Sequence, residues 1–157
     1  MEKERFLSAV YMIIKNQNGE ILLQRRQGSS RWPGFLGLPA GHIDEGENAY
    51  DAIIREAREE LNISITKEDL GDYFVANRRN KTAMPYFDIY FEVNNFKGDI
   101  TINEPDKCSE LKWCDINNLP YDLIDFQVEA IKNWQKGIKF SVIDTDDEIS
   151  IENLKHA

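Results

Sequence analysis

The segment from Asn48 to Leu61 constrains the fold more than any other part of the chain. It consists of good helix formers, and Asn62 follows where a residue in the left-handed conformation often ends a helix. Its apolar residues recur at steps of three and four, as one buried helix face requires: Ala49, Ala52, Ile53, Ala57 and Leu61. A helix of this kind has to bury its apolar face against another layer of structure.

Strand-like segments lie on both sides of this helix. Residues 8–15 are apolar and β-branched, and residues 21–25 are expected to return from a turn at 16–19 as the second strand of a hairpin. Segment 27–37 is expected to be a loop, and 41–47 a polar loop. Further strands are expected at 73–76, 86–93 and 111–114, and a second amphipathic helix at 123–134. This order predicts an α/β fold, a mixed β-sheet flanked by helices.

The 157 residues fit one domain, 1–157, and the 41% of hydrophobic residues suffice for a core. The acidic tail 141–157 is the least determined part: residues 141–143 pair as an edge strand or fray with the remainder. No apolar stretch approaches the ~20 residues that span a bilayer, and the N-terminus does not resemble a signal peptide. We therefore expect a cytoplasmic protein without a membrane partner.

The formal net charge of −9, without a long basic stripe, argues against a nucleic acid polymer as partner. An acidic protein can still bind a small polyphosphate if a divalent metal ion and a few arginines supply local positive charge. Cys108 and Cys114 lack the spacing of a zinc site or a disulfide framework. The sequence leaves the oligomeric state open, a homodimer included.

Glu56, Glu59 and Glu60 are spaced so that a helix presents all three carboxylates on one face. Like charges at this spacing destabilise a helix by roughly a few tenths of a kcal/mol per pair. The arrangement makes sense if a cation sits over the carboxylates, whose oxygens suit a hard ion such as Mg²⁺. The alternative is an ordinary solvated helix face, which these three residues alone do not exclude.

The longer spacing resembles the signature of the Nudix hydrolase family. That signature is Gly, five residues, Glu, seven residues, then Arg-Glu-aliphatic-any-Glu-Glu-any-Gly-aliphatic. The matching residues are Gly41, Glu47, Arg55, Glu56, Ala57, Glu59, Glu60 and Ile63. A chance match of the single-residue requirements has a probability on the order of 10⁻⁵ at typical residue usage. Asn62 replaces the usual glycine, a mild departure because Asn also enters the left-handed region.

The resemblance extends to both sides of the signature and covers roughly residues 8–135. Residues 38–47 resemble the family's Leu-Pro-Gly-Gly entry to the loop, with Ala40 in place of the first glycine. Residues 22–25 resemble a strand end frequent in MutT-like members, and residues 104–113 resemble a segment of a subgroup of small Nudix proteins. Membership implies an α/β/α sandwich in which the signature forms a loop–helix–loop.

The resemblance also implies roles for the signature residues. Glu56, Glu59 and Glu60 would coordinate Mg²⁺, with Mn²⁺ as a substitute, and the backbone carbonyl of Ala40 would be a further ligand. Glu47 and Arg55 would form an ion pair that fixes the loop against the helix. For the base that activates water, the candidates are Glu56, Glu59, Glu104 and Glu110.

Substrate contacts are expected from residues outside the signature. Arg25 is a candidate for a phosphate contact, Arg78 is a weaker one, and Phe35 is a candidate for stacking on a base; for each, a structural role is the alternative. His42 lies in the signature loop without being required by it. Substrate identity depends on the loops 27–37 and 77–85.

Together these features predict Mg²⁺-dependent hydrolysis of a pyrophosphate bond in a nucleoside triphosphate or related nucleotide, by attack of water at phosphorus. One alternative is a hydrolase of a nucleoside diphosphate linked to another group, as in ADP-ribose or a dinucleotide. The other is a Nudix module that binds a nucleotide without turning it over. Degenerate modules typically lose signature glutamates, and this chain keeps all of them.

Overall fold

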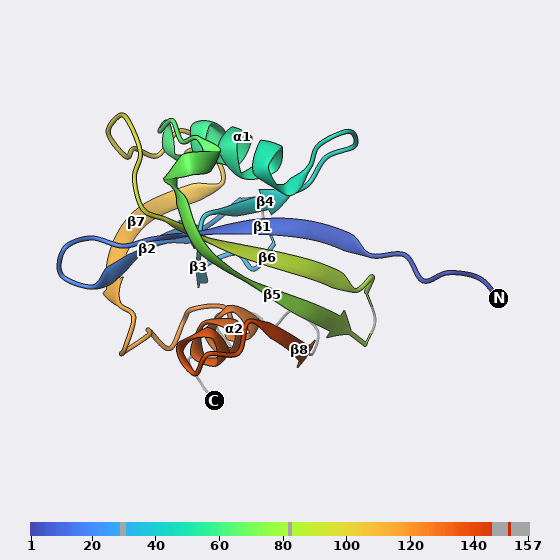
Figure 1. The fold of residues 1–157 in the computed structure, drawn as a ribbon. Coiled ribbons are helices and arrows are strands. Elements are labelled where there is room, and N and C mark those ends of the chain that lie inside the picture. Colours follow the sequence, from blue (N-terminus) through green and yellow to red (C-terminus); the bar gives the residue numbers. More distant parts are fainter. Residues whose placement is uncertain (29–30, 82, 146–150, 152–157) are drawn as a thin grey trace.

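The computed structural model describes residues 1–28, 31–81, 83–145 and 151, and it contains two β-sheets and two α-helices (Figure 1). The five-stranded mixed sheet has the spatial order β4 (Ala40–His42), β1 (Leu7–Ile14), β6 (Tyr86–Val93), β5 (Leu70–Asn80), β8 (Phe140–Thr145). The antiparallel three-stranded sheet has the order β3 (Leu36–Gly37), β2 (Glu20–Arg26), β7 (Cys108–Asp115). The helices are α1 (Ala49–Leu61), α2 (Asp125–Gln135) and the short 3₁₀ helix η1 (Lys67–Asp69).

The central strand β1 divides the core into two layers because its side chains alternate between the faces of the sheet. Met12 and its neighbours on one face pack in a cluster with Ile53 and other residues of α1. Ile13 and Tyr11 on the opposite face pack in a cluster that includes Phe126 of α2. Figure 1 shows α1 above the large sheet and α2 below it. The α/β/α sandwich expected from the sequence is confirmed.

Helix α1 begins and ends where its sequence predicts. Asn48 caps the N-terminus: its side chain accepts a hydrogen bond from the Asp51 N–H, and the Asp51 carboxylate accepts one from the Asn48 N–H. Asn62 adopts the left-handed conformation, with φ of 58°, and its N–H reaches the carbonyl oxygens of Ala57 and Arg58. These caps fix the helix register, and with it the direction of every carboxylate on α1.

The predicted hairpin of residues 8–15 and 21–25 is wrong. The turn forms, and Lys15 and Ile21 make one isolated antiparallel bridge, but β1 then pairs with β4 and β6 while β2 pairs with β3 and β7. Leu22 and Leu23 are both fully buried, as are neighbouring side chains of β1. Both strands are therefore covered on both faces, each within its own sheet.

Two short strands lie in segments that were expected to be loops. Strand β3 lies at the end of the expected loop 27–37, and β4 begins the signature loop and pairs with β1. The first alternative for residues 141–143 is confirmed, because β8 is the edge strand beside β5. Most of the remaining tail, 146–150 and 152–157, lies outside the described residues.

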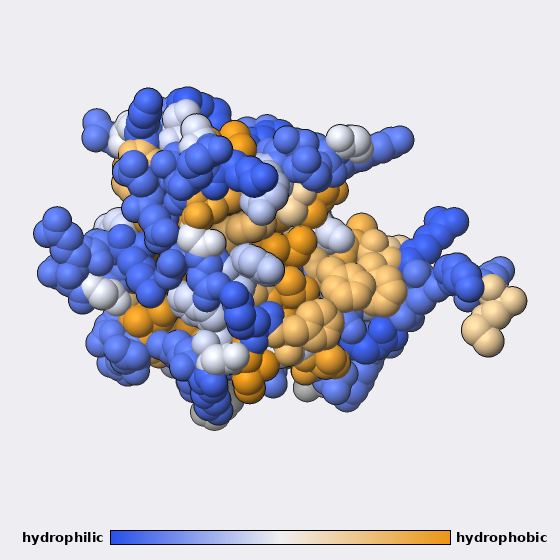
Figure 2. Space-filling view, in the orientation of Figure 1, coloured by the Kyte–Doolittle hydropathy of each residue, from blue (hydrophilic) through white to orange (hydrophobic). Residues whose placement is uncertain are grey.

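Helix α1 covers only part of the upper sheet face. Figure 2, in the same orientation, shows apolar side chains gathered below α1, over β6 and β5. Phe140 and Val142 of β8 are largely exposed, and the rings of Phe6 and Phe87 lie 4.8 Å apart.

In the part of the chain that the structure describes, no helix has both the length and the apolar content to cross a membrane.

Candidate active site

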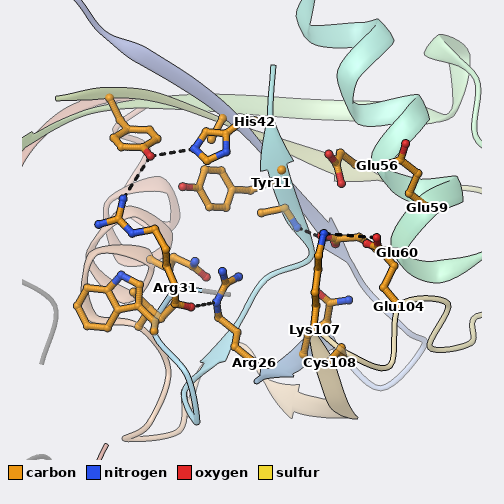
Figure 3. A pocket seen from close by; sticks show the side chains of 18 of the residues that line it. Tyr11, Arg26, Arg31, His42, Glu56, Glu59, Glu60, Glu104, Lys107 and Cys108 are labelled. Atoms are coloured by element: carbon orange, nitrogen blue, oxygen red, sulfur yellow. Dashed lines mark hydrogen bonds and ion pairs between the residues drawn. The ribbon is translucent and has the colours of Figure 1, made fainter. Parts of the chain in front are cut away.

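A cavity of about 560 Å³ lies between the signature segment and α2 (Figure 3). Its two walls differ in chemistry. The wall formed by α1, β4 and the segment before β7 is rich in carboxylates. The wall formed by α2, loop 31–32 and the ends of β5 and β6 carries aromatic rings, amides and guanidinium groups. We call these the acidic wall and the aromatic wall.

The acidic wall brings together the three glutamates of α1. Glu56, Glu59 and Glu60 all line the cavity, and Glu104 joins them from the segment before β7. Glu56 is buried, Glu60 is half-buried and Glu59 is exposed. The helical spacing of the three residues therefore places their carboxylates beside one common space.

Arg55 organises this wall by hydrogen-bonding to three carboxylates at once. Its Nε and Nη2 donate to the two oxygens of Glu47 at 2.7 and 2.8 Å, and its Nη1 donates to Glu56 at 2.6 Å and to Glu59 at 3.1 Å. Its Nη2 also donates to the carbonyl oxygen of His42 at 3.0 Å, which ties β4 to the helix. The Arg55 guanidinium lowers the pKa of Glu47 to about 2. The predicted ion pair of Glu47 and Arg55 is confirmed.

Burial and the proximity of other carboxylates disfavour the charged forms of Glu56 and Glu60. The pKa of Glu60 is raised well above its ordinary value, because the protein desolvates it and Glu56 lies near. The pKa of Glu56 is raised by burial, against the opposing effect of Arg55. Gly41 makes room for this packing, since a Cβ atom there would lie 2.1 Å from the Glu56 carboxylate.

The donor set fits a hard divalent cation. Among the described residues, no group of three or more acidic, histidine or cysteine side chains is arranged so that it could hold a metal ion by itself. Instead Arg55 holds Glu56 and Glu59, and the Ala40 N–H donates to Glu60 Oε2 at 3.1 Å. Mg²⁺ is usually held by one or two carboxylates together with waters and substrate phosphates, so it needs no closed protein cage. The glutamates of α1 can supply these carboxylate ligands, and the cavity beside them leaves room for waters and a substrate phosphate.

The aromatic wall is held by a buried ion pair. Arg78 donates to both oxygens of Asp88, at 2.7 and 3.2 Å, and the Tyr11 hydroxyl donates to the same carboxylate at 2.9 Å. The Arg78 guanidinium lies between the rings of Tyr86 and Phe126, about 4 Å from each centroid. These contacts make the wall rigid and satisfy its charges internally.

The candidate substrate residues are distributed unevenly around the cavity. Arg78 lines it, but its guanidinium is committed to Asp88. Arg25 and Glu110 are not among the lining residues: Arg25 donates to Glu110 and to Asp122, at 3.1 and 2.6 Å. Phe35 is buried in the core behind Trp32, with the ring centroids 5.2 Å apart, and does not line the cavity either.

Several lining residues were not predicted from the sequence. Arg26 faces the cavity where Arg25 was the candidate, and Trp32 lines it where Phe35 was the candidate. Strand alternation alone could have offered Arg26 as the alternative to Arg25, since neighbouring side chains of a strand point to opposite faces. Gln24, Lys107 and Gln127 carried no signal in the sequence. His42 also lines the cavity, and its Nε2 lies 2.8 Å from the Tyr86 hydroxyl.

Comparisons with known proteins bear on the family and the fold of the chain. A family model for the NUDIX domain matches residues 5–134. An ADP-ribose pyrophosphatase from Methanocaldococcus jannaschii is 28% identical over 132 residues, which are 82% of this chain and 75% of that protein. An RNA pyrophosphohydrolase from Ruthia magnifica is 23% identical over 88% of this chain and 84% of its own. The crystal structure of a MutT NUDIX hydrolase from Burkholderia pseudomallei superposes with a TM-score of 0.69 at 26% identity, covering 82% of this chain and 98% of the other.

Proposed function

Since the chain belongs to the Nudix family and is a Nudix hydrolase, we propose that it hydrolyses a pyrophosphate bond in a nucleoside triphosphate or a related nucleotide, with Mg²⁺ as cofactor. One observation carries this proposal. Glu56, Glu59, Glu60 and Glu104 share a single cavity, opposite a wall of aromatic and amide side chains. The first set suits a cation and a diphosphate, and the second suits the remainder of a nucleotide.

In this proposal the acidic wall contains the residues that hold the cofactor and catalyse the reaction. Glu56, Glu59 and Glu60, with the Ala40 carbonyl, hold Mg²⁺. When bound, the ion offsets the negative charge that develops on the phosphate oxygens. Glu47 and Arg55 position the wall, because Arg55 links the loop to the helix.

The chain's own carboxylates also handle the proton. Water attacks phosphorus and the P–O bond to the leaving phosphate breaks, while a carboxylate of the wall takes the proton of the water. Glu56 and Glu104 are the two candidates that we favour. Both are supported by their position, because each lines the cavity beside Glu59 and Glu60. Glu59 stays a candidate, whereas Glu110 does not line the cavity.

The second candidate function is hydrolysis of a nucleoside diphosphate linked to another group. It is supported by the similarity to a protein named as an ADP-ribose pyrophosphatase. Both functions use the same acidic wall and differ in what the rest of the cavity accepts. The products distinguish them, since a triphosphate releases pyrophosphate or phosphate and ADP-ribose releases AMP.

The test is a panel of nucleoside triphosphates, ADP-ribose and a dinucleoside polyphosphate, each assayed with Mg²⁺ and with EDTA. Glu59→Gln keeps the shape of the side chain and removes its charge, and we expect it to lower Mg²⁺-dependent turnover by about 100-fold. Glu68→Gln, on the exposed helix η1, is the matched control and should retain full activity. Turnover that is the same with EDTA, or the same in Glu59→Gln, would contradict the proposal.

A further inference from the structure

Two glutamines that line the cavity each have a polar group without a hydrogen-bond partner among the described residues. Gln24 and Gln127 are only 6% and 2% exposed. Burying an amide without a hydrogen-bond partner is unfavourable, so buried amides are normally paired. A buried amide that faces a cavity and lacks a partner therefore points to a ligand.

The orientation of the Gln127 amide is fixed by the backbone. Its Oε1 accepts a hydrogen bond from the Leu38 N–H at 2.8 Å. Because an N–H needs an acceptor, the oxygen has to face Leu38 and the Nε2 has to face away from it. Gly37, which has no side chain, lies beside this group: a Cβ atom there would lie 3.5 Å from Nε2. Gln127 thus presents a fixed donor to the cavity.

Gln24 is the more unusual of the two. It lies on β2, opposite Gly37 of β3 in the antiparallel register. Among the described residues its side chain has no hydrogen-bond partner, although the residue is only 6% exposed. Its amide is held by no internal contact, so it can serve as donor or as acceptor.

The surroundings of Gln127 indicate which part of a substrate these amides meet. Gln127 and Phe126 belong to α2, on the opposite side of the sheet from the carboxylates of α1. The Trp32 ring lies 6.2 Å from that of Phe126 and completes an aromatic wall there. Trp32 holds φ at 57°, a conformation that a bulky residue rarely adopts and that persists only where the surrounding structure enforces it.

We propose that Gln127 and Gln24 are specificity-determining residues that hydrogen-bond the polar edge of a nucleobase resting against Trp32 and Phe126. Gln127 Nε2 requires an acceptor on the base, such as an exocyclic oxygen or a ring nitrogen, and Gln24 reads a neighbouring group. This inference rests on the proposed function, because it places the diphosphate at the acidic wall. A site built to pair with such groups discriminates strongly against compounds that lack them, because its amides then stay unpaired.

Two variants test the assignment. Gln24→Met fills the same space and breaks no hydrogen bond of the protein, so we expect an unchanged melting temperature and about a ten-fold lower kcat/KM for the preferred nucleotide, mainly through KM. Gln127→Glu keeps the acceptor for the Leu38 N–H but replaces the donor by a second oxygen, and should lower kcat/KM at least as much. Gln135→Met, an exposed glutamine of α2, is the matched control.

Inorganic tripolyphosphate, which has no base, separates this role from a contact to phosphate. Gln24→Met, which leaves the charge of the cavity unchanged, should leave its hydrolysis unchanged. An equal loss with tripolyphosphate and with the nucleotide would overturn the proposal, because the amides would then bind phosphate. So would wild-type kcat/KM for every nucleotide in Gln24→Met.

Binding of nucleoside monophosphates in EDTA separates this inference from the proposed function. Trp32 lines the cavity, so tryptophan fluorescence should report binding of the base without any chemistry. If no substrate is hydrolysed but a nucleoside monophosphate binds wild type and binds Gln24→Met about ten-fold more weakly, the proposed function fails and the base site stands. If nucleotides are hydrolysed and neither variant changes the affinity for the monophosphate, the base site fails alone.

Discussion

The two walls of the cavity differ in how far cationic side chains compensate their carboxylates. On the aromatic wall, the carboxylate of Asp88 is matched by Arg78 and by the hydroxyl of Tyr11. On the acidic wall, Glu56 and Glu60 are desolvated beside each other, which raises the pKa of both. The charge of Asp88 is thus matched within the protein, whereas the acidic wall keeps negative charge for a cation to compensate. Burial also raises the pKa of Asp88, so desolvation is common to both walls. The walls differ in compensation, because Arg78 binds one carboxylate whereas Arg55 is shared by Glu47, Glu56 and Glu59.

Breaking the buried ion pair should have the largest effect. Arg78→Met leaves Asp88 buried without its cation, and we expect the free energy of unfolding to fall by about 3–5 kcal/mol in urea denaturation. Arg78→Met combined with Asp88→Asn should recover much of that loss, because no charge is then left unpaired. A single variant as stable as wild type would remove the contrast between the walls.

Neutralising a carboxylate of the acidic wall should act in the opposite direction on stability. Glu60→Gln should lower kcat by about 100-fold, or about 2.7 kcal/mol of activation free energy, while raising the free energy of unfolding in EDTA at pH 7. The sign follows from the raised pKa: above the unfolded value of 4.5, ionisation of Glu60 disfavours the folded state. An unfolding free energy that falls in Glu60→Gln would show that this carboxylate is stabilising.

Gly41→Ala tests the packing of the acidic wall. The new Cβ atom would collide with the Glu56 carboxylate, and we expect a loss of about 1–3 kcal/mol in the free energy of unfolding together with reduced turnover. In the background of Glu56→Ala the same substitution should cost clearly less, which a double-mutant cycle measures. Equal costs in both backgrounds would mean that Glu56 does not pack on Gly41.

The smallest effect is expected at Glu47, which is stabilised by Arg55. Its folded pKa of about 2 lies below its ordinary pKa of 4.5, so its contribution to stability is present above about pH 4.5 and is lost as the pH falls towards 2. The difference in unfolding free energy between wild type and Glu47→Gln should therefore be constant above that range and shrink in acid. A difference that does not depend on pH between 2 and 6 would exclude the ion pair as its cause.

The sequence predicted the acidic wall better than the aromatic wall. The spacing of Glu56, Glu59 and Glu60 defines a helix face whatever the helix packs against. The choice of Arg25 over Arg26 depended on which face of β2 meets the cavity, and β2 pairs with β7 across a register shift between these two residues. No pattern within β2 reveals that pairing.

Taken alone, the sequence determined helix α1, its C-terminal cap, its carboxylates and the family, because each of these depends on residues close together in the sequence. The tertiary structure decided the aromatic wall and the divergence of β1 and β2 into two sheets. The hydrogen bond from Tyr11 to Asp88 joins residues 77 positions apart, and that from Leu38 to Gln127 joins residues 89 apart. Such contacts form only when strands and helices pack, because local propensities carry no information about which distant segments meet.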